Sequence, residues 1–432
     1  MSADIQHGLD RLQHAKDELV AQAAASGPPG SDTYLQGYYR HVAGEDILGR
    51  SSGDLYGAAA SHHELALNRP QGTASVRVLT PSEEDDGWRA GGHTVVEVVA
   101  EDMPFLVDSV TAELTRHGRA IHLVIHPLLT VRRDVSGRLL EVCDVASREA
   151  SREDAAVESW IHVEIDRETD PAARDDLTSD LQRILRDVRE VVEDWDKMRA
   201  AAVRIASEVE ADQRVAVARQ EAAEAAELLR WLSSDHFTFM GYREYALETD
   251  ADDGSDRLRA LPGTGLGILR DDQSQSQSFS RLPREVRERA RDAKLLVLTK
   301  ANSRSTVHRP AYLDYVGVKV FDADGAVAGE RRFLGLFTSA AYTESIQRIP
   351  VLRRKAAEVL VRSGFSATSH SGKALLQILE TYPRDELFQI SIDDLYDIVL
   401  GVLSLQQRRE LRLFVRRDDY GRFWSCLVFL PR

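Results

Sequence analysis

The sequence predicts a mixed α+β protein made of several small domains. The chain has 432 residues, enough for roughly two to four domains with cores of their own. Short stretches that alternate apolar and polar residues are followed by tight turns, a pattern typical of antiparallel strands. Amphipathic helices occur between groups of strands rather than after every strand, which favours helices packed on an antiparallel sheet over a parallel α/β sheet.

Composition and charge narrow the class of protein. Hydrophobic residues make up 43% and charged residues 29% of the chain, as in water-soluble globular proteins. The formal net charge of −15 repels phosphate backbones, so we expect no nucleic-acid partner. No apolar run approaches the roughly 20 residues of a membrane helix, and the start of the chain lacks a signal-peptide pattern. Cys143 and Cys426 have no metal-ligand spacing, and we expect two buried thiols in a reducing cytoplasm.

Residues 1–92 are expected to form a helical segment and a linker. Apolar residues at helical spacing predict the first helix, which the Gly-Pro-Pro-Gly sequence at 27–30 ends. Small helices, one strand and an acidic, solvated loop follow. The expected elements are helices over 5–25, 34–41 and 55–67, a strand over 76–79 and a loop over 81–92.

Residues 93–201 predict a compact domain with the element order β-α-β-β-β-α. An antiparallel sheet with helices on one face in this order approximates the ferredoxin-like plan. The expected elements are strands over 93–100, 120–132, 139–145 and 160–165, a turn at 135–137, and helices over 105–117 and 171–201.

Residues 202–235 predict a connector helix, and residues 236–342 a second β-rich domain. The connector is rich in Ala, Glu and Arg and has a thin apolar stripe, so we expect it to bridge two domains, with one break. The domain has about five strands and one inserted helix, resembles a PAS-type sensor fold, and has a good hairpin turn at Asp322–Gly325. The expected elements are strands over 237–245, 265–269, 295–299, 312–321 and 327–337, loops over 250–256 and 274–280, and a helix over 285–293.

The last part is expected to divide into a helical linker over 343–389 and an incomplete α+β unit over 390–432. Pro383 ends the second linker helix, and Ser391–Asp394 has the form of a capping box before a clean apolar helix. One helix and two apolar strands cannot cover their own sheet, so we expect the chain to be part of something longer. The expected elements are helices over 346–362, 369–382 and 391–403, and strands over 411–415 and 423–430.

The sequence lacks the motifs of a dinucleotide-binding enzyme. Such enzymes have a glycine-rich turn between a strand and a helix. Gly263–Gly267 is the nearest candidate, but its third glycine comes one residue early and a strand follows it. No P-loop, zinc-protease or serine-hydrolase motif occurs. We therefore expect no catalytic or cofactor-binding residue in this chain.

Three histidines offer a metal-site alternative. His122 and His126 lie four apart on one predicted strand and so share a face, and His162 lies on a neighbouring predicted strand. A zinc site also needs acidic or thiol neighbours on that face, and the sequence places none there. We expect hydrogen-bonded sheet histidines and no metal. An independent metallohydrolase built on these histidines is the least favoured alternative.

The loop Glu101–Asp108 joins a strand to a helix and is the first candidate effector site. Backbone amides at the start of a helix attract a carboxylate. Asp102 and Met103 lie in the loop, and Asp102 or Asp108 could take the ammonium group of an amino acid. The competing interpretation is ordinary helix capping.

The segment Asn302–Pro310 lies between two apolar strands and is the second candidate. It contains Arg304, His308 and Arg309, and the two arginines could clamp a carboxylate bidentately. They could equally form ion pairs within the chain or with another subunit. We favour the structural or interface interpretation and keep the three residues as effector-site candidates.

Five segments of the chain have distinctive sequences. They are Glu101–Val110 (EDMPFLVDSV), Asp235–Tyr245 (DHFTFMGYREY), Leu298–Asp322 (LTKANSRSTVHRPAYLDYVGVKVFD), Gly329–Ser339 (GERRFLGLFTS) and Tyr382–Ser391 (YPRDELFQIS). Together they resemble the amino-terminal region of the large bacterial NAD-specific glutamate dehydrogenases. The similarity extends from about residue 90 to the end, and the long segment 298–322 is the most specific.

The resemblance implies a regulatory and assembly role. Those enzymes oxidatively deaminate L-glutamate to 2-oxoglutarate and ammonia with NAD, form homo-oligomers, and in some members respond to amino-acid effectors. Their amino-terminal half carries ACT-like domains and a PAS-like domain, and the catalytic part lies further along. By this resemblance, 93–201 is a first ACT-like domain, 236–342 the PAS-like domain and 390–432 part of a second ACT-like domain. We expect a cytoplasmic segment that holds no NAD itself and works with the remainder of its parent chain; a purely architectural scaffold is the alternative.

Overall fold

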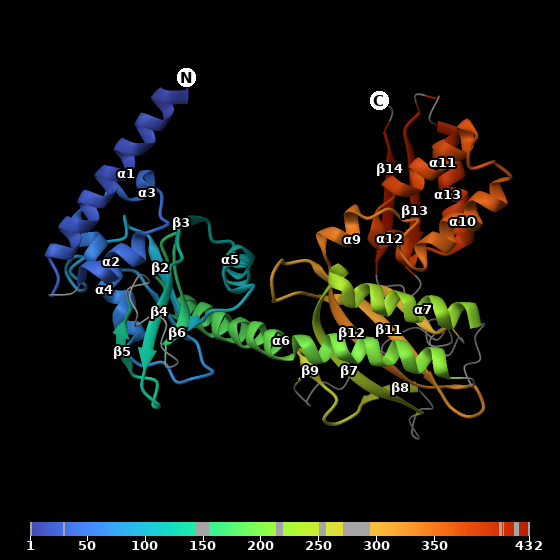
Figure 1. Cartoon of the computed structure of the whole chain (residues 1–432), viewed down its shortest axis with the longest axis horizontal. Coiled ribbons are helices and arrows are strands. Elements are labelled where there is room, and N and C mark those ends of the chain that lie inside the picture. Colours follow the sequence, from blue (N-terminus) through green and yellow to red (C-terminus); the bar gives the residue numbers. More distant parts are fainter. Residues whose placement is uncertain are drawn as a thin grey trace. The chain divides into compact units, whose positions relative to one another are not determined.

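The chain folds into antiparallel sheets flanked by helices (Figure 1). Its contacts divide it into two compact units. Unit 1 consists of Met1–Arg189 and Thr306–Pro310, and unit 2 of Glu190–Ser305 and Ala311–Arg432. The computed structural model describes residues 2–28, 31–143, 155–212, 219–249, 256–270, 294–405, 408, 410–418 and 423–430.

The first helices of unit 1 belong to the same core as its sheet. Tyr34, Tyr38 and Leu55 are buried together with Val99 and Trp160 of the strands. The expected boundary between residues 92 and 93 therefore does not separate two compact units. The helices are α1 (Ser2–Ala25), α2 (Ser31–Tyr39), α3 (Gly44–Ile47) and α4 (Ser52–Ala66).

The sheet of unit 1 has six strands, all paired antiparallel. The hydrogen-bonded order is β1-β2-β6-β4-β5, and β3 pairs with the other half of β6. Its strands are β1 (Ser75–Leu79), β2 (Thr94–Glu101), β3 (Ile121–Ile125), β4 (Leu128–Arg133), β5 (Leu139–Val142) and β6 (Ala155–Ile165), and its helices are α5 (Leu106–Arg116) and the first half of α6 (Pro171–Ala211).

The long strand expected over 120–132 is wrong, because two strands occupy this stretch. Pro127 lies between β3 and β4, lacks a backbone N–H, and so cannot continue a strand inside a sheet. Its carbonyl oxygen instead accepts a hydrogen bond from the Trp160 amide at 3.1 Å. The element order from β2 onward is therefore β-α-β-β-β-β-α.

The central strand β6 is covered on both faces. Residues 158–165 are all buried, and successive side chains of a strand point to opposite faces. Trp160 packs against Tyr34 of α2 with the ring centroids 5.8 Å apart. The helices α2 and α4 thus cover the face of the sheet that carries Trp160.

Unit 2 has a second six-stranded sheet, again entirely antiparallel. The hydrogen-bonded order is β10-β11-β12-β7-β8, and the short β9 pairs with β7. The hairpin over Asp322–Gly325 forms as expected, with the Gly325 amide donating to the Asp322 carbonyl at 3.2 Å. The strands are β7 (Phe237–Thr249), β8 (Asp256–Ala260), β9 (Leu266–Gly267), β10 (Leu296–Arg304), β11 (Tyr312–Phe321) and β12 (Val327–Phe337).

The helices expected to connect two domains are part of the core of unit 2. Ala202, Ala206, Ala225 and Leu229 are buried beside Phe333 of the sheet. Alanines supply much of this contact. An apolar stripe counted from large side chains leaves alanines out, and the stripe of the connector therefore seems thin. The residues come from the second half of α6 and from α7 (Arg219–Trp231).

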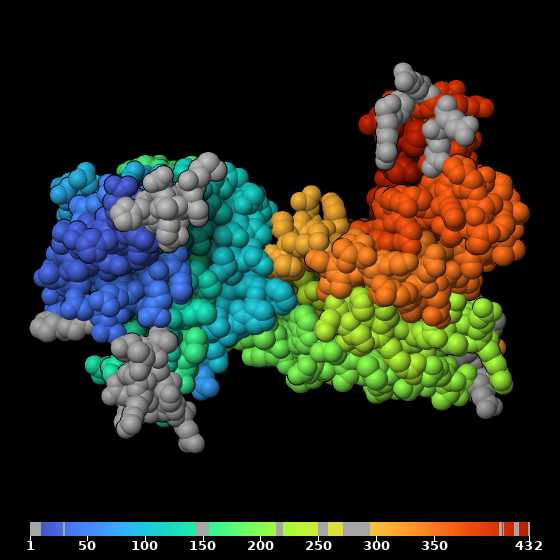
Figure 2. All heavy atoms as spheres, turned by 45° about the horizontal axis from the view of Figure 1, so that its top comes forward, coloured from blue at the N-terminus to red at the C-terminus, as the bar shows by residue number. Residues whose placement is uncertain are grey.

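Helices and a final hairpin complete unit 2. In Figure 2 the hairpin (red) projects beyond the helices that precede it in the chain (orange). The short helix over 384–389 was not expected from the sequence. The elements are α9 (Ser339–Thr343), α10 (Leu352–Ser363), α11 (His370–Thr381), α12 (Arg384–Gln389), α13 (Ile392–Leu405), β13 (Arg412–Arg417) and β14 (Trp424–Phe429).

Three further expectations concern the fold. The helix expected over 285–293 and the loop over 274–280 lie outside the described residues, as does most of the loop over 250–256. Cys426 is exposed, so the expectation of two buried thiols holds for Cys143 alone. Across the described ranges, no helix is both long and apolar enough to cross a membrane.

Candidate functional site

Two of the predicted effector-site segments meet in unit 1. The His308 Nδ1 atom lies 2.9 Å from Asp108 Oδ2, and the His308 amide donates to Ser109 Oγ at 2.9 Å. The two segments are 200 residues apart in the sequence. Asp108 and His308 therefore engage each other through one carboxylate oxygen and one ring nitrogen.

Both sides of this contact contain a residue with unusual backbone geometry. Phe105 has φ 75° and His308 has φ 67°, and their rings lie 5.1 Å apart. A bulky residue in the left-handed region costs roughly 1–2 kcal/mol and persists only where neighbouring contacts hold it. The contacts between residues 105–109 and His308 therefore hold the backbone of Phe105 and His308 in a strained conformation.

The other predicted site residues do not join this contact. The Asp102 amide donates to the Val157 carbonyl at 3.1 Å, which ties the loop to the sheet. Arg304 lies over the ring of Tyr312 at 5.1 Å, a cation–π contact at the end of β10. Met103 is half-buried and Arg309 is exposed.

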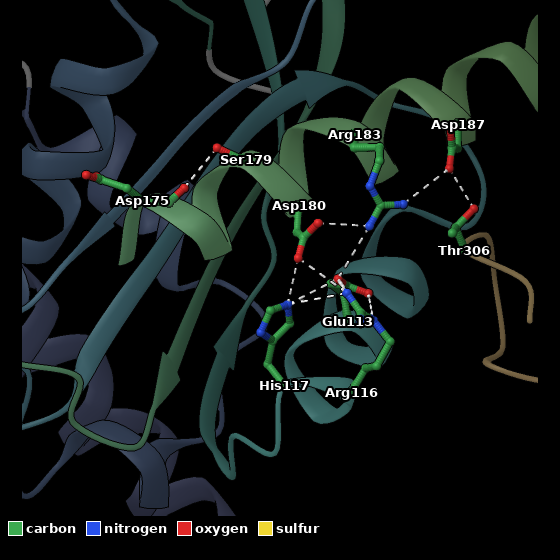
Figure 3. A network of polar contacts seen from close by, with 9 residues as sticks. All are labelled: Glu113, Arg116, His117, Asp175, Ser179, Asp180, Arg183, Asp187 and Thr306. Atoms are coloured by element: carbon green, nitrogen blue, oxygen red, sulfur yellow. Dashed lines mark hydrogen bonds and ion pairs between the residues drawn. The ribbon is translucent and has the colours of Figure 1, made fainter. Parts of the chain in front are cut away.

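An ionic network links the two helices on which this contact rests (Figure 3). Glu113 of α5 and His117, which directly follows α5, face Asp180 of α6. The His117 Nε2 atom lies 3.0 Å from Asp180 Oδ2 and 3.3 Å from Glu113 Oε1. Arg116 bonds to Glu113, and Arg183 lies 3.0 Å from Asp180. These contacts clamp α5 to α6.

Glu113, His117 and Asp180 also have the residue types and closeness of a metal site. The guanidinium groups of Arg116 and Arg183 already pair with the two carboxylates. Glu113 is almost fully buried, so it requires such a partner when ionised. We interpret the cluster as an ion-pair network between helices.

The network continues to the segment Thr306–Pro310. Thr306 Oγ1 donates to Asp187 Oδ2 at 2.7 Å, and Asp187 lies 4.0 Å from Arg183 (Figure 3). Burial raises the pKa of the Asp187 carboxyl, against the lowering influence of the Thr306 hydrogen bond. The same segment is thus held at Thr306 by α6 and at His308 by α5.

A second polar region, which sequence reasoning missed, lies buried under the amino-terminal helices. Glu164 of β6 is 1% exposed and pairs bidentately with Arg50 at 2.5 and 2.7 Å. Burial alone would raise the pKa of the Glu164 carboxyl, but the neighbouring His162 (Nε2–Oε1 3.5 Å) and Arg50 lower it to about 2. Glu158 of the same strand is held by Arg69 and Arg133.

His62 of α4 is also enclosed in this region. Its Nδ1 lies 2.9 Å from the Tyr38 hydroxyl and its Nε2 lies 3.1 Å from the Val98 carbonyl oxygen. A carbonyl can only accept, so Nε2 carries the proton and Nδ1 accepts from Tyr38. Burial is the main cause that lowers the pKa of His62 to about 3. The imidazole is therefore neutral and acts as a fixed bridge between α2, α4 and β2.

The three histidines of the metal alternative do not converge. His122 pairs with Asp166 at 2.8 Å and stacks on His93, whereas His126, between the end of β3 and Pro127, contacts Ser159 Oγ at 2.6 Å. His162 is fully buried near His62, with ring centroids 6.4 Å apart. His122 lies in β3 and His126 directly follows its end at Ile125, and each of the two has a different partner.

Models of glutamate dehydrogenase regions match three parts of the chain. The model for the ACT1 domain matches residues 34–181, that for helical motif 1 matches 349–408, and that for the ACT2 domain matches 412–432. The ACT1 match includes α2 and α4, in agreement with their place in the core of unit 1.

Curated relatives agree with these matches. The chain is 41% identical over 426 residues to the NAD-specific glutamate dehydrogenase of Halomonas elongata, covering 98% of this chain and 26% of the relative. For the Pseudomonas aeruginosa enzyme of the same name the identity is 36% over 441 residues, covering 100% and 26%. For that of Mycobacterium tuberculosis it is 32% over 372 residues, covering 86% and 21%. The chain spans about a quarter of the length of the first two relatives. It belongs to the family of NAD-specific glutamate dehydrogenases, of which it is an amino-terminal region that carries ACT-domain sequence.

Proposed function

We propose that this chain is a regulatory and assembly segment of an NAD-dependent glutamate dehydrogenase. The parent reaction is the oxidative deamination of L-glutamate to 2-oxoglutarate and ammonia with NAD. The observation that carries the proposal is the match of the ACT1, helical motif 1 and ACT2 models to this chain. In addition, every described strand pair is antiparallel, whereas dinucleotides bind at the carboxyl ends of parallel strands.

The first test is enzymatic. The purified 432-residue chain, mixed with L-glutamate and NAD, is expected to produce no NADH, and adding the catalytic part of a longer relative restores the reaction. Glutamate-dependent NAD reduction by the chain alone would overturn the proposal.

The proposal includes an amino-acid effector that acts near the contact between Asp108 and His308. An effector can shift a distant catalytic part only if it binds two states of the protein unequally. The strained backbone at Phe105 and His308 supports the proposal that this segment has two arrangements. If a ligand replaced the contact between Asp108 and His308, the backbone could leave its strained conformation. Asp102, Met103, Arg304 and Arg309 remain candidates for contacts in the second arrangement.

Calorimetry with aspartate, asparagine, arginine, glutamate and leucine tests this effector proposal. We expect at least one amino acid to bind, and the substitution Asp108→Asn to weaken binding about tenfold or more, because a charged hydrogen bond is lost. Asp46→Asn, an exposed acidic residue of α3, is the matched control. If no amino acid binds, the purely architectural scaffold is the better description.

An assembly role is favoured by the outer face of the final hairpin. Leu413, Val415 and Trp424 are 55%, 49% and 65% exposed, and the register of β13 with β14 places them on one face with Val428. The opposite face carries Phe414, Leu427 and Phe429, which pack on the core of unit 2. Large apolar side chains on both faces of a strand pair are typical of a sheet covered on both sides. We propose that the remainder of the parent chain covers the outer face.

The proposal also includes three further features. The sheet of unit 2 would serve as a PAS-like sensor or scaffold, the parent would be a homo-oligomer, and it would act in the cytoplasm. Light scattering of the parent protein tests the second feature, because a strict monomer would contradict it.

A further inference from the structure

The short helix α12 contacts both the sheet of unit 2 and the final hairpin through two adjacent acidic residues. Asp385 Oδ2 lies 2.9 Å from Lys300 Nζ of β10. Glu386 Oε1 accepts a hydrogen bond from Arg416 Nε of β13 at 2.6 Å. Adjacent residues of a helix lie roughly 100° apart around its axis, so their side chains leave it in different directions. One charged contact of α12 therefore faces the sheet, and the other faces the hairpin.

The contact on the sheet side is part of a buried group of charges. Lys300 Nζ also lies 2.6 Å from Asp314 Oδ1, and the two residues are register partners on β10 and β11. Asp314 is 3% exposed, and its other oxygen accepts a hydrogen bond from the Phe337 amide at 3.2 Å. The other oxygen of Asp385 accepts from the Tyr342 hydroxyl at 2.8 Å. The ammonium group of Lys300 thus lies between two carboxylates, which would repel each other without it.

The contact on the hairpin side is also enclosed. Glu386 and Arg416 are each 8% exposed. Arg416 follows Phe414 by two positions, so it shares the inner face of the hairpin, which packs on the core of unit 2. In the described part of the chain, β13 and β14 pair only with each other. Because a two-stranded hairpin is marginally stable alone, its order depends on how firmly this inner face is docked.

Two further contacts fix the end of α12 against its neighbours. Lys355 Nζ of α10 donates to the carbonyl oxygens of Leu387, Phe388 and Ile390 at 3.0, 2.9 and 2.7 Å. These carbonyls belong to the last turn of the helix and the residue after it, where partners within the helix are missing. Phe388 also stacks on Phe337 at the end of β12, with ring centroids 4.7 Å apart. With its end held in this way, α12 is a short rigid element between the two charged contacts.

We propose that α12 couples the sheet of unit 2 to the final hairpin, so that docking of the hairpin depends on the pairing of Lys300 with Asp385. When the Lys300 ammonium group is removed, repulsion from Asp314 displaces Asp385 and, with it, the adjacent Glu386. The contact between Glu386 and Arg416 then weakens, and the hairpin is released more often. The two states that the coupling links are the docked and the released hairpin.

The coupling has a direction within the family to which the chain belongs. The hairpin is part of the stretch that the ACT2 model matches. If the remainder of the parent chain covers the outer face of the hairpin, α12 carries a change in the sheet of unit 2 toward that remainder. This last step rests on the proposed function, whereas the coupling inside unit 2 does not.

Hydrogen exchange on the full 432-residue chain tests the coupling. Lys300→Met and Asp385→Asn should each speed exchange of the β13 and β14 amides about tenfold or more, because a charged hydrogen bond that holds α12 is lost. Exchange in β7 and β12 should change less. Tyr315→Phe is the matched control, since it removes a hydroxyl that donates to the buried Glu330 from the residue next to Asp314. It should alter exchange in the hairpin by about twofold or less.

A double-variant cycle separates coupling from two independent losses. Arg416→Met alone should speed exchange in the hairpin about tenfold or more, because its buried charged hydrogen bond to Glu386 is lost. Combined with Asp385→Asn, it should give an acceleration clearly smaller than the product of the two single effects, because both changes act on the same docked state.

Several outcomes would overturn the inference. These are unchanged exchange in the hairpin of both Lys300→Met and Asp385→Asn, an equal acceleration in Tyr315→Phe, or a double variant whose acceleration equals the product. Hairpin amides that exchange as fast as those of an unfolded peptide in the unaltered chain would show that the hairpin is not docked. Asp385→Asn leaves Lys300 paired with Asp314, so it keeps the test valid if Lys300→Met fails to fold. The readout needs neither NAD nor an effector, so failure of the proposed function leaves the coupling intact, and the reverse also holds.

Discussion

The strands β6 and β14 have opposite relations between polarity and burial. β6 contains Glu158, His162 and Glu164, yet residues 158–165 are all buried. β14 contains no charged residue, yet every second side chain is exposed. The difference teaches that the layers packed on a strand decide its burial, and that charges tolerate burial when guanidinium groups pair with them. β14 therefore has the apolar composition of a buried strand, although the described residues cover only one of its faces.

The largest expected effect comes from a matched pair of tryptophan substitutions. Trp160→Ala should lower the free energy of unfolding by about 3–5 kcal/mol, because Trp160 is fully buried between helix and sheet. Trp424→Ala should change it by about 0.5 kcal/mol or less, because its side chain is 65% exposed. Chemical denaturation, together with hydrogen exchange in β6 and β14, measures the free-energy changes of both variants. Similar losses of unfolding free energy in the two variants would contradict the difference in burial between β6 and β14.

A buried ion pair should give the next largest effect. Glu164→Gln leaves the Arg50 guanidinium without its carboxylate and should lower the free energy of unfolding of unit 1 by about 3 kcal/mol. Glu248→Gln, which removes the half-exposed partner of Arg259 in unit 2, should cost about 0.5 kcal/mol. An equally mild effect at Glu164 would mean that β6 is less enclosed than its burial indicates.

The two units should also respond to acid in opposite directions. In unit 1 the pKa of His62 is lowered to about 3, so its contribution to stability is present above about pH 6.5 and is lost as the pH falls below that value. Protonation of Glu164, with a pKa lowered to about 2, removes a further contribution as the pH falls below about 4.3.

In unit 2 the contribution of Asp314 to stability changes with pH in the opposite direction. Burial raises the pKa of this carboxyl to about 6, despite the attraction of Lys300 at 2.6 Å. Its contribution is complete below its ordinary pKa of about 3.9 and is lost as the pH rises through about 6. Hydrogen exchange at about pH 7 and pH 4.5 should therefore show a loss of protection in β2 and β6, on the order of 2 kcal/mol, that β11 and β12 do not share. Asp314→Asn should remove the opposing trend from unit 2.

The smallest effect on folding is expected from the outer face of the hairpin. Leu413→Thr combined with Val428→Thr should change the free energy of unfolding by about 0.5 kcal/mol or less, because both side chains are about half exposed. The same change should reduce self-association and weaken binding to the remaining part of a longer relative. Ser404→Thr, at an exposed position of α13, is the control. A loss of more than about 2 kcal/mol would contradict an uncovered face.

Much of the fold could be predicted from local pattern. The bounds of β11 and β12 were predicted correctly because alternation of apolar residues and an Asp-rich turn coincide at Asp322–Gly325. The two strands at Pro127 were missed because apolar residues continue on both sides of the proline. The helices α6 and α7 were assigned too little burial because alanines, which carry their contact with the sheet, look neutral in a count of large apolar residues.

The candidate site was less accessible to sequence reasoning. Asp108 and His308 were each selected from their own segments, but no spacing rule joins residues 200 positions apart. The buried carboxylates of β6 were missed because alternating charges normally mark the solvated face of a strand. The signal that could have revealed them is Trp160 on the same face, since a large aromatic side chain between two glutamates indicates cover.

The segment Thr306–Pro310 makes unit 1 discontinuous in the sequence, because it is inserted between two strands of the other unit. A gene fragment that encodes only residues 1–189 would therefore omit the partners of Asp108, Ser109 and Asp187. Duplication or transfer of a contiguous stretch of coding sequence cannot move this unit intact, so its two parts are expected to be inherited together.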